Sequence, residues 1–310
     1  MTDYLTDYIG QSDSKSRLNF YINQHKTSGF LPPIGIFGSR GLGKSELARA
    51  VAKNLDNSEG KIKKYVEVNC STLKGIQDFI DDLYTPHIAG RQEVTILLDE
   101  AHAMGHKLND WLLSATNTEK ENLNVVGYNG QDFEFDYNKL SLIVATTNPE
   151  KLSQPFLSRF RRFDLAQYKN GEISQILSNL LRDKNIEIES EVSDNISTYC
   201  RGTPRHAVHL NKDIIGYCQQ EDKESFDEND WVNLRKILGI KPLGLTNQEL
   251  QVLRELNSGP KTLTNLAARL KVDRQTLQKD IESFLLSNSL IQVDGKRYIT
   301  QFGQKILKEV

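Results

Sequence analysis

One segment of the chain has the residue types and spacing of a phosphate-binding loop. Residues 38–45 match the pattern G-x-x-x-x-G-K-[ST], and they lie between a strand-like apolar run and a helical run. Glycines let backbone N–H groups turn towards a phosphate, and the N-terminus of the following helix adds a favourable dipole. Lys44 would contact the β- and γ-phosphates, while the Ser45 hydroxyl would bind Mg²⁺. We therefore expect ATP to be bound by Gly38, Gly41, Leu42, Gly43, Lys44, Ser45 and Glu46.

A pair of carboxylates follows an apolar run further along the chain. Residues 94–98 read Val-Thr-Ile-Leu-Leu, and Asp99 and Glu100 come directly after them. Open α/β sheets bind ligands at the carboxyl ends of their strands, so this pair is expected near the phosphates. Asp99 is suited to bind Mg²⁺, and Glu100 is suited to orient and deprotonate an attacking water. His102 completes an Asp-Glu-Ala-His string, to which we assign only local packing or hydrogen bonding.

A second apolar run, at residues 141–146, ends in Thr147 and Asn148. Asn148, helped by Thr147, would be placed to contact the γ-phosphate or the attacking water. A plain polar strand end fits the same pattern, and the residues alone favour that alternative slightly.

Arginines supply the remaining candidates. Arg159, Arg161 and Arg162 lie together beside aromatic residues, and a permanently charged guanidinium suits the charge of a transferred phosphoryl group. A solvated basic turn is the alternative. Arg205 falls in the first turn of a predicted helix, where it opposes the helix dipole unless an anion lies nearby.

The elements that would position these residues alternate between strand and helix. Apolar runs predict strands at residues 33–37, 65–69, 94–98 and 142–146, with helices between them such as 45–55 and 76–83. This alternation is typical of a parallel sheet with helices on both faces. Residues 171–238 have an all-helical pattern, and residues 239–244, with one proline and two glycines, read as a linker. Three domains are therefore expected, over residues 1–168, 169–240 and 241–310.

The third domain has the pattern of a winged helix. Thr246 and Glu249 form a capping-box signature, helical spacing follows at residues 251–256, 263–270 and 274–284, and Asp294-Gly295 predicts a hairpin turn. Residues 244–310 contain ten Lys and Arg against seven Asp and Glu, a mild tilt towards nucleic acid. A winged helix that contacts protein is the alternative. The residues expected to contact DNA are Arg274, Gln275, Lys279, Lys296 and Arg297.

The amino-acid composition is typical of an ordinary globular protein. Of its 310 residues 38% are hydrophobic and 26% are charged, with a formal net charge of −2. No apolar run approaches the ~20 residues that cross a bilayer, and the N-terminus lacks a signal-peptide core. The three cysteines are far apart and form no C-x-x-C pair, which argues against a zinc site or a disulfide framework. A cytoplasmic location is expected.

Taken in order, these segments resemble AAA+ ATPases, and most closely the RuvB family of Holliday-junction branch-migration motors. The more specific strings are Leu-Thr-Asp-Tyr-Ile-Gly-Gln at residues 5–11 and Arg-Gly-Thr-Pro-Arg at residues 201–205. The phosphate loop and the acidic pair are shared by many families. Further matches are at residues 145–147, 158–160 and 243–245, so the resemblance covers nearly the whole chain.

The resemblance implies roles for individual residues. Tyr8 and Ile9 would line an adenine pocket, Asn148 would be sensor 1, and Arg205 would be sensor 2. Arg159 would be the finger that reaches the ATP of a neighbouring subunit, with Arg161 and Arg162 as alternatives for the same role. A finger that acts between subunits implies a homo-oligomeric ring, by family analogy a hexamer.

The resemblance also implies a fold and an activity. The fold would be an AAA+ α/β domain, then an all-helical lid, then a C-terminal winged helix. The activity would be ATP hydrolysis coupled to translocation along duplex DNA, with branch migration at Holliday junctions in recombination and repair.

A predicted hairpin at residues 123–137, with Asn129-Gly130 at its turn, matches the place where the family binds its partner RuvA. Here the hairpin is acidic, with Asp132, Glu134 and Asp136. Arg40 stands where the family usually has proline. Asn148 stands where RuvB proteins typically do not use asparagine, and in this respect the chain is more similar to clamp-loader ATPases. These departures fit a divergent relative, for example one encoded by a virus, whose partner need not be a standard RuvA.

Two other functions remain open on the residues. One is a clamp loader, helicase loader or replication initiator. These proteins also use an AAA+ ATPase core on DNA, and archaeal and eukaryotic initiators join that core to a winged helix. A nucleotide-gated DNA-binding regulator would bind ATP with little turnover, although Glu100 and Arg159 argue against it.

Overall fold

The computed structural model describes residues 2–117 and 122–310. The chain forms two compact units. The first comprises Met1–Glu172 with Thr203–Arg205, and the second comprises Ile173–Gly202 with His206–Val310. The expected division into three domains, after residues 168 and 240, stays a prediction.

A five-stranded parallel sheet forms the centre of the first unit. Its strands, in spatial order, are β2 (Lys64–Asn69), β3 (Val94–Asp99), β6 (Leu140–Thr146), β1 (Ile34–Phe37) and β7 (Arg161–Asp164). All neighbouring strands pair in parallel, so the four predicted strands are confirmed with small shifts at their ends. The sequence did not predict β7, because its charged residues read as a basic turn; it is an edge strand with only Phe163 buried.

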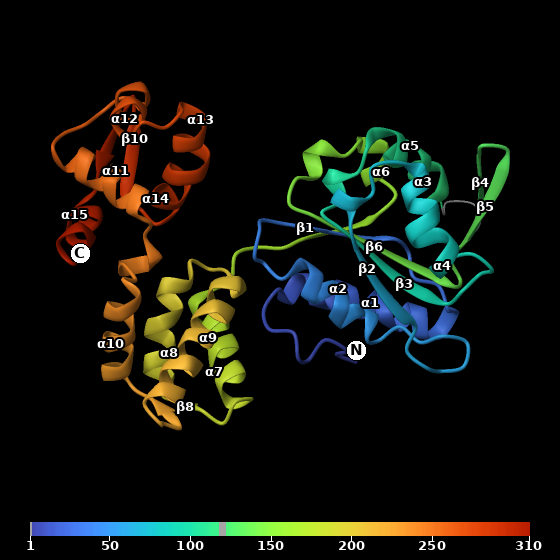
Figure 1. Ribbon diagram of the computed structural model, residues 1–310, viewed down its shortest axis with the longest axis horizontal. Helices are drawn as coiled ribbons and strands as arrows, with labels where there is room; N and C mark the ends of the chain where they lie inside the picture. Colours follow the sequence, from blue (N-terminus) through green and yellow to red (C-terminus); the bar gives the residue numbers. More distant parts are fainter. Residues whose placement is uncertain (1, 118–121) are drawn as a thin grey trace. The chain divides into compact units, whose positions relative to one another are not determined.

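The strand register brings the carboxyl ends of three strands, each followed by polar residues, to the same end of the sheet. Phe37, the last residue of β1, pairs with Thr146, the last residue of β6. Leu98, one residue before the end of β3, pairs with Val144 of β6. The residues that follow β1, β3 and β6 therefore lie side by side, as Figure 1 shows for the strands themselves.

Helices cover both faces of this sheet. They are α1 (Ser12–Ser28), α2 (Lys44–Ala52), α3 (Ile76–Phe79), α4 (Thr85–His87), α5 (His106–Ala115) and α6 (Gln154–Leu157). Figure 1 shows α1 and α2 on one side of the sheet and α3, α5 and α6 on the other. Ile96 and Leu98 of β3 pack towards this second side, in one apolar core with Trp111 and Phe156. The predicted helix at 76–83 is α3 continued by a π-helical turn at Ile80–Tyr84.

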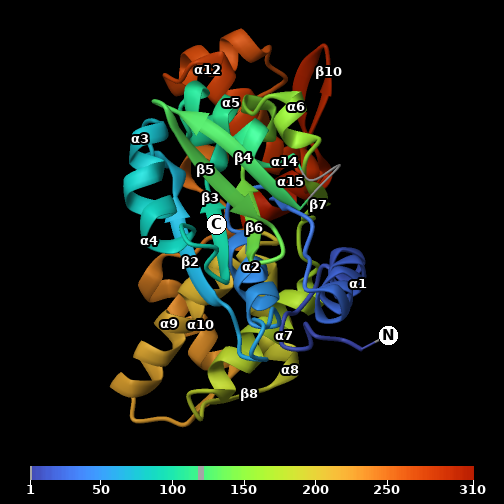
Figure 2. The ribbon, with the colours of Figure 1, turned by 90° about the vertical axis from the view of Figure 1, so that its right-hand side faces the viewer.

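The predicted hairpin is confirmed. Its strands β4 (Leu123–Tyr128) and β5 (Gln131–Asp136) are antiparallel, and Asn129 and Gly130 both have positive φ, of 50° and 76°. Positive φ at both turn residues matches the right-handed twist of the strands. One face of the hairpin buries Phe133 and Phe135 against Trp111. Both ribbon views show β4 and β5 side by side (Figures 1 and 2).

The second unit begins with a helical part. Its helices are α7 (Asn170–Arg182), α8 (Ser190–Ser197), α9 (Pro204–Gln220) and α10 (Glu228–Leu238), although the first residues of α7 and α9 belong to the first unit. The expectation of an all-helical pattern needs one correction, because β8 (Glu187–Ile188) and β9 (Ser225–Phe226) form a short parallel pair. Trp231 of α10 is fully buried and stacks edge-on against Tyr199.

The C-terminal part of the second unit has the winged-helix plan. Its elements are α11 (Asn247–Asn257), α12 (Leu263–Leu270), α13 (Arg274–Thr276), α14 (Ser283–Ser287), β10 (Ile291–Asp294), β11 (Lys296–Ile299) and α15 (Gln301–Lys308). A π-helical turn at Leu277–Glu282 joins α13 to α14. The capping box of Thr246 and Glu249 is confirmed, and it starts α11 four residues before the predicted helix at 251. Leu253, Leu266, Leu277 and Leu285 belong to a separate apolar core.

No helix in the described part of the chain is long and apolar enough to span a bilayer.

Candidate functional site

The phosphate loop lies between β1 and α2, as predicted. Gly41 and Gly43 have φ of 87° and 83°, a region that favours glycine. A side chain at Gly43 would also come within 3.0 Å of the Tyr8 hydroxyl oxygen. These positions therefore require glycine for both backbone and space.

Lys44 starts α2 and is buried. Its Nζ donates hydrogen bonds to the carbonyl oxygens of Gly38 and Ser39, at 2.9 Å and 3.1 Å. Burial lowers the pKa of Lys44, whereas the negative charges of Glu100 and Asp99 act to raise it. A buried ammonium whose closest partners are neutral carbonyls is a favourable place for an anion.

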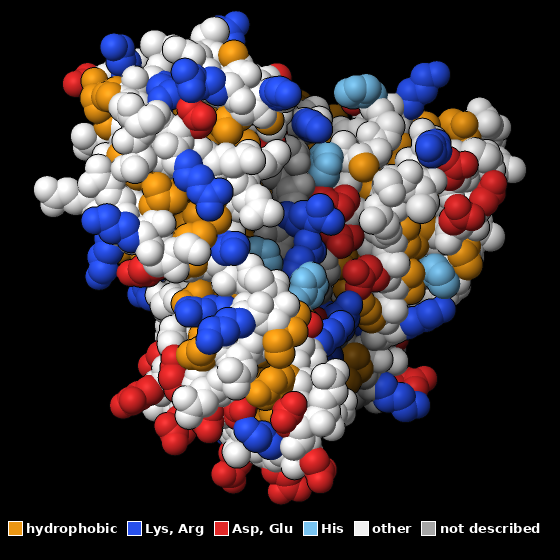
Figure 3. All heavy atoms as spheres, turned by 60° about the vertical axis from the view of Figure 1, so that its left-hand side comes forward, with side chains coloured by type: hydrophobic (Ala, Val, Ile, Leu, Met, Phe, Trp, Pro, Cys, Tyr) orange, Lys and Arg blue, Asp and Glu red, His pale blue; other side chains and the backbone are white. Residues whose placement is uncertain are grey.

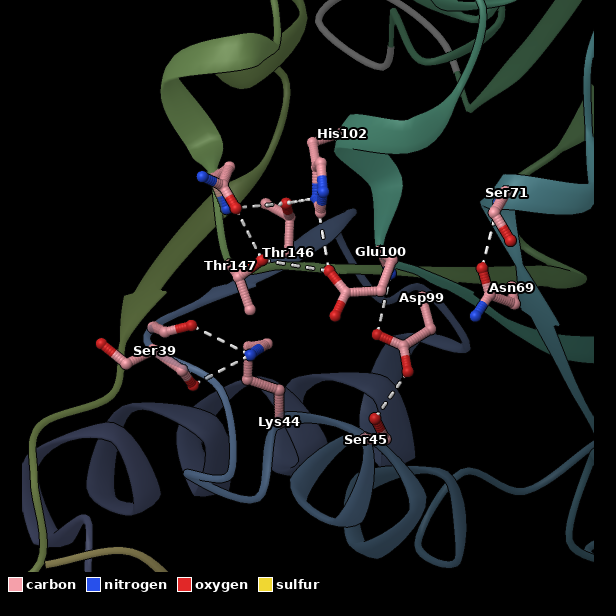
Figure 4. Close-up of polar contacts among 12 residues, drawn as sticks. Ser39, Lys44, Ser45, Asn69, Ser71, Asp99, Glu100, His102, Thr146 and Thr147 are labelled. Carbon is pink, nitrogen blue, oxygen red and sulfur yellow. Dashed lines mark hydrogen bonds and ion pairs between the residues drawn. The ribbon is translucent and has the colours of Figure 1, made fainter. Parts of the chain in front are cut away.

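The two expected magnesium ligands face each other. Ser45 Oγ donates a hydrogen bond of 2.8 Å to Asp99 Oδ2, and Asp99 Oδ1 accepts one of 2.8 Å from the backbone N–H of Glu100 (Figure 4). In the described residues no group of three or more His, Cys, Asp and Glu side chains is arranged to hold a metal. This oxygen pair fits Mg²⁺, which commonly takes one or two protein oxygens and completes its shell with phosphate and water.

Glu100 lies directly after β3, and its backbone φ of 51° is left-handed. Its Oε2 accepts a hydrogen bond of 3.2 Å from Thr147 Oγ1, and His102 Nδ1 lies 3.3 Å from the same oxygen. Figure 4 shows Glu100 between Thr147 and Asp99, above Lys44. The structure thus brings together the phosphate loop, the acidic pair and the end of β6.

Thr147, rather than Asn148, makes the direct contact with Glu100. Asn148 Nδ2 donates to Glu150 Oε1 at 3.1 Å, and Asn148 Oδ1 accepts from Thr147 Oγ1 at 2.8 Å. Asn148 therefore reaches the acidic pair through Thr147. From the sequence, Thr147 was expected only to help Asn148, because the composition of a strand end does not show which side chain points to the next strand.

Tyr8 packs against the phosphate loop. Its hydroxyl donates to the Gly43 carbonyl at 3.3 Å and accepts from the Tyr168 hydroxyl at 2.9 Å. Burial raises the pKa of Tyr8, so this hydroxyl stays protonated. Ile9 is half-buried beside it. Tyr168 was not predicted, because 160 residues separate it from Tyr8.

Arg205 also reaches the phosphate loop, since its backbone N–H donates to the Gly41 carbonyl at 3.4 Å. The three finger candidates have different surroundings. Arg162 donates hydrogen bonds to Asp164, the shortest of 2.8 Å, and Arg161 is exposed. Arg159 is half-buried.

The predicted DNA-contacting residues divide into two groups. Arg274, Gln275, Lys279 and Lys296 are exposed. Arg297 instead donates two hydrogen bonds to Glu282, at 2.8 Å and 3.1 Å, and these side chains are only 11% and 1% exposed. The charge of Arg297 is therefore paired inside the domain, and its expected contact with phosphate stays a prediction. Figure 3 shows Lys and Arg side chains, in blue, on the face of the surface that it presents.

Two family models match the chain. The model described as "ATPase family associated with various cellular activities (AAA)" matches residues 34–169, and that of the "RuvB C-terminal winged helix domain" matches residues 242–308. The chain is an AAA+ ATPase that resembles the RuvB family. This AAA+ ATPase binds nucleotide and hydrolyses ATP, as the phosphate loop and the acidic pair predicted.

Relatives along the whole chain carry the RuvB name. The Holliday junction branch migration complex subunit RuvB of Campylobacter hominis is 29% identical, over 97% of this AAA+ ATPase and 88% of the relative. The same subunit of Mycoplasmopsis pulmonis is 26% identical, over 98% and 96%. The RuvB Holliday junction branch migration motor of Thermotoga maritima has a similar structure, with a TM-score of 0.76 at 24% identity, over 100% of this chain and 98% of that one. The expected fold class is thereby confirmed.

Proposed function

We propose that the chain is an ATP-driven DNA motor of RuvB type, which couples ATP hydrolysis to translocation of duplex DNA at branched junctions. The observation that carries the proposal is one chain that joins an AAA ATPase domain to a winged helix of RuvB type. A nucleotide site alone fits many motors and switches, and a winged helix alone fits many DNA-binding proteins. Their combination along the full length of named RuvB relatives favours this motor.

In this proposal the phosphate loop and Lys44 bind the triphosphate of Mg-ATP. Ser45 and Asp99 hold Mg²⁺, which would neutralise developing phosphate charge. Their oxygens already lie 2.8 Å apart across the site. Glu100 takes a proton from the attacking water, and Thr147 and Asn148 supply the polar contacts at the end of β6.

The remaining nucleotide contacts extend from this centre. Tyr8 and Ile9 border the adenine, because Tyr8 is fixed against Gly43 at the start of α2. Arg205 senses the γ-phosphate, from its position against Gly41. Arg159 is the finger offered to the ATP of a neighbouring subunit, the role that the match of residues 158–160 to the RuvB family implies. The active form is then a ring, with a hexamer as the expected size.

The acidic hairpin β4–β5 is the proposed surface for a junction-binding partner. Its exposed face carries Val125, Asp132 and Glu134, and Glu134 forms an ion pair of 3.1 Å with Arg91. This chemistry favours a partner surface that offers cations around a small apolar contact.

Duplex DNA is bound by the winged helix. Arg274, Gln275 and Lys279 lie on the exposed face of the helical segment that starts with α13 and would enter a groove. Lys296, next to the hairpin turn at Gly295, would contact a phosphate.

We expect Lys296→Ala to weaken DNA binding equally for all sequences and to reduce the salt slope of log K by about one. A phosphate contact by one lysine releases about one counterion. The measurement is a titration of duplex DNA at several salt concentrations. Lys308→Ala, at the end of α15, is the matched control. An unchanged slope in Lys296→Ala would reject the phosphate contact.

A synthetic four-way junction tests the function itself. Purified protein should move the junction in the presence of ATP, and Glu100→Gln should not. Turnover stimulated by a circular clamp or a replicative helicase, without junction movement, would instead favour a loader. Binding of ATP with negligible turnover on any DNA would favour a regulator.

A further inference from the structure

One polar side chain beside the acidic pair has no part in the function proposed above. His102 lies in a 3₁₀ turn (Ala101–Ala103) that follows β3, and its side chain is 19% exposed. Its Nδ1 lies 2.8 Å from Thr146 Oγ1 and 3.3 Å from Glu100 Oε2. Figure 4 shows the imidazole between these two residues, which come from the ends of neighbouring strands.

The surroundings of Nδ1 decide which ring nitrogen carries the proton. An ionised Glu100 can only accept a hydrogen bond, and Thr146 Oγ1 accepts one of 3.1 Å from the backbone N–H of Asn148. A proton on Nδ1 is donated to Thr146 Oγ1 at 2.8 Å and places positive charge 3.3 Å from the Glu100 oxygen. A bare Nδ1 would instead direct its lone pair at the carboxylate. We therefore assign the proton to Nδ1.

With that proton in place, two polar hydrogens lie close to Glu100 Oε2. Thr147 Oγ1–H donates to it at 3.2 Å and shares this one proton with Asn148 Oδ1 at 2.8 Å. His102 Nδ1–H, hydrogen-bonded to Thr146, lies 3.3 Å away in ion-pair contact. Glu100 Oε1 makes no hydrogen bond within residues 2–117 and 122–310. One oxygen of the carboxylate is thus anchored, and the other remains available to accept a proton.

We propose that His102 is a positioning residue for ATP hydrolysis: held by Thr146, it anchors Oε2 of Glu100 so that Oε1 receives the proton of the attacking water. The water oxygen then bonds to the γ-phosphorus as the bond to the β,γ-bridging oxygen breaks, which gives ADP and phosphate. His102 itself neither gains nor loses a proton in this step. The inference rests on the role of Glu100 proposed above.

His102→Ala should lower kcat for ATP roughly tenfold, the scale seen when a supporting hydrogen bond is lost. The KM and the nucleotide affinity should stay unchanged, because His102 does not contact the phosphate loop. His102→Asn should recover much of kcat, since its amide nitrogen can occupy nearly the position of Nδ1. His106→Ala, an exposed histidine at the start of α5, is the control and should behave as wild type.

A second pair of variants tests the anchor without altering the histidine. Thr146→Val keeps the shape of this fully buried side chain but removes its hydroxyl, and Thr146→Ser keeps the hydroxyl. Thr146→Val should lower kcat at least as much as His102→Ala, because it also removes the acceptor of the Asn148 N–H. The double variant should be little worse than Thr146→Val alone, because both changes break the contact between His102 and Thr146. Fully additive losses would overturn the proposal.

The outcomes separate this inference from the proposed function. Wild-type kcat in His102→Ala, with Glu100→Gln inactive, would reject the positioning role and leave the motor proposal standing. A failure of His102→Asn to exceed His102→Ala would also reject it. Full activity in Glu100→Gln would reject both, since the carboxylate to be positioned would then have no role.

Discussion

Replacing Glu100 by glutamine should lower kcat for ATP by about 10²–10⁴-fold, the usual contribution of a general base. Glutamine keeps the size of the side chain, and its carbonyl can still accept the hydrogen bond that Thr147 donates at 3.2 Å. It cannot accept a proton from water at neutral pH. Phosphate release under saturating ATP measures the loss.

Binding of Mg-ATP should persist in the same variant, because Lys44 and the Ser45–Asp99 pair are unchanged. Equilibrium binding of a fluorescent ATP analogue checks this. Glu67→Gln, in the neighbouring strand β2, is the control for loss of a carboxylate outside the site. Turnover in Glu100→Gln within a factor of about three of wild type would show that another group acts as the base.

The second large expected effect is a loss of stability in the second unit. Arg201→Ala should lower the free energy of local unfolding of α11 by about 3–5 kcal/mol, as when one partner of a buried ion pair is removed. Arg201 donates two hydrogen bonds to Glu249, of 2.7 Å and 3.0 Å, and its guanidinium lies 3.7 Å from the Phe284 ring centre. The Glu249 side chain is only 2% exposed. Without Arg201 this carboxylate would stay buried and lose both bonds.

Native-state hydrogen exchange of the α11 amides measures this change. Arg269→Ala is the matched control, because Arg269 pairs with Glu255 at 3.1 Å where both side chains are partly exposed. Exposed pairs contribute about 0–1 kcal/mol, so the control should change little. Equal protection of α11 in the two variants would mean that the Arg201–Glu249 pair does not stabilise the domain.

The sequence predicted the centre of the site because that chemistry is local. Residues 38–45 carry their own turn geometry, and Asp99 and Glu100 follow a strand whose burial is evident from its aliphatic run. A parallel sheet then brings the strand ends together without further information. The hairpin at Asn129-Gly130 and the capping box of Thr246 and Glu249 were predictable for the same reason.

The residues whose surroundings the sequence did not predict all have partners elsewhere along the chain. Arg297 reads as a free cation until Glu282, fifteen residues away, is found against it. Tyr168 gains a role only from Tyr8, and Thr147 only from Glu100 in the neighbouring strand. A single sequence shows which groups a strand end offers, whereas their direction is set by packing between elements.

The most direct test of the whole account is equilibrium binding of Mg-ATP to the purified chain and to Lys44→Ala. Lys44 is the buried cation of the loop, and a hydrogen bond to a charged group contributes about 1.5–3 kcal/mol. We predict that the wild-type chain retains Mg-ATP, that Lys44→Ala binds it roughly 10–100-fold more weakly, and that Lys53→Ala, just beyond the other end of α2, binds as wild type. Equal affinity of the Lys44→Ala and wild-type chains, or no binding by either, would contradict the account.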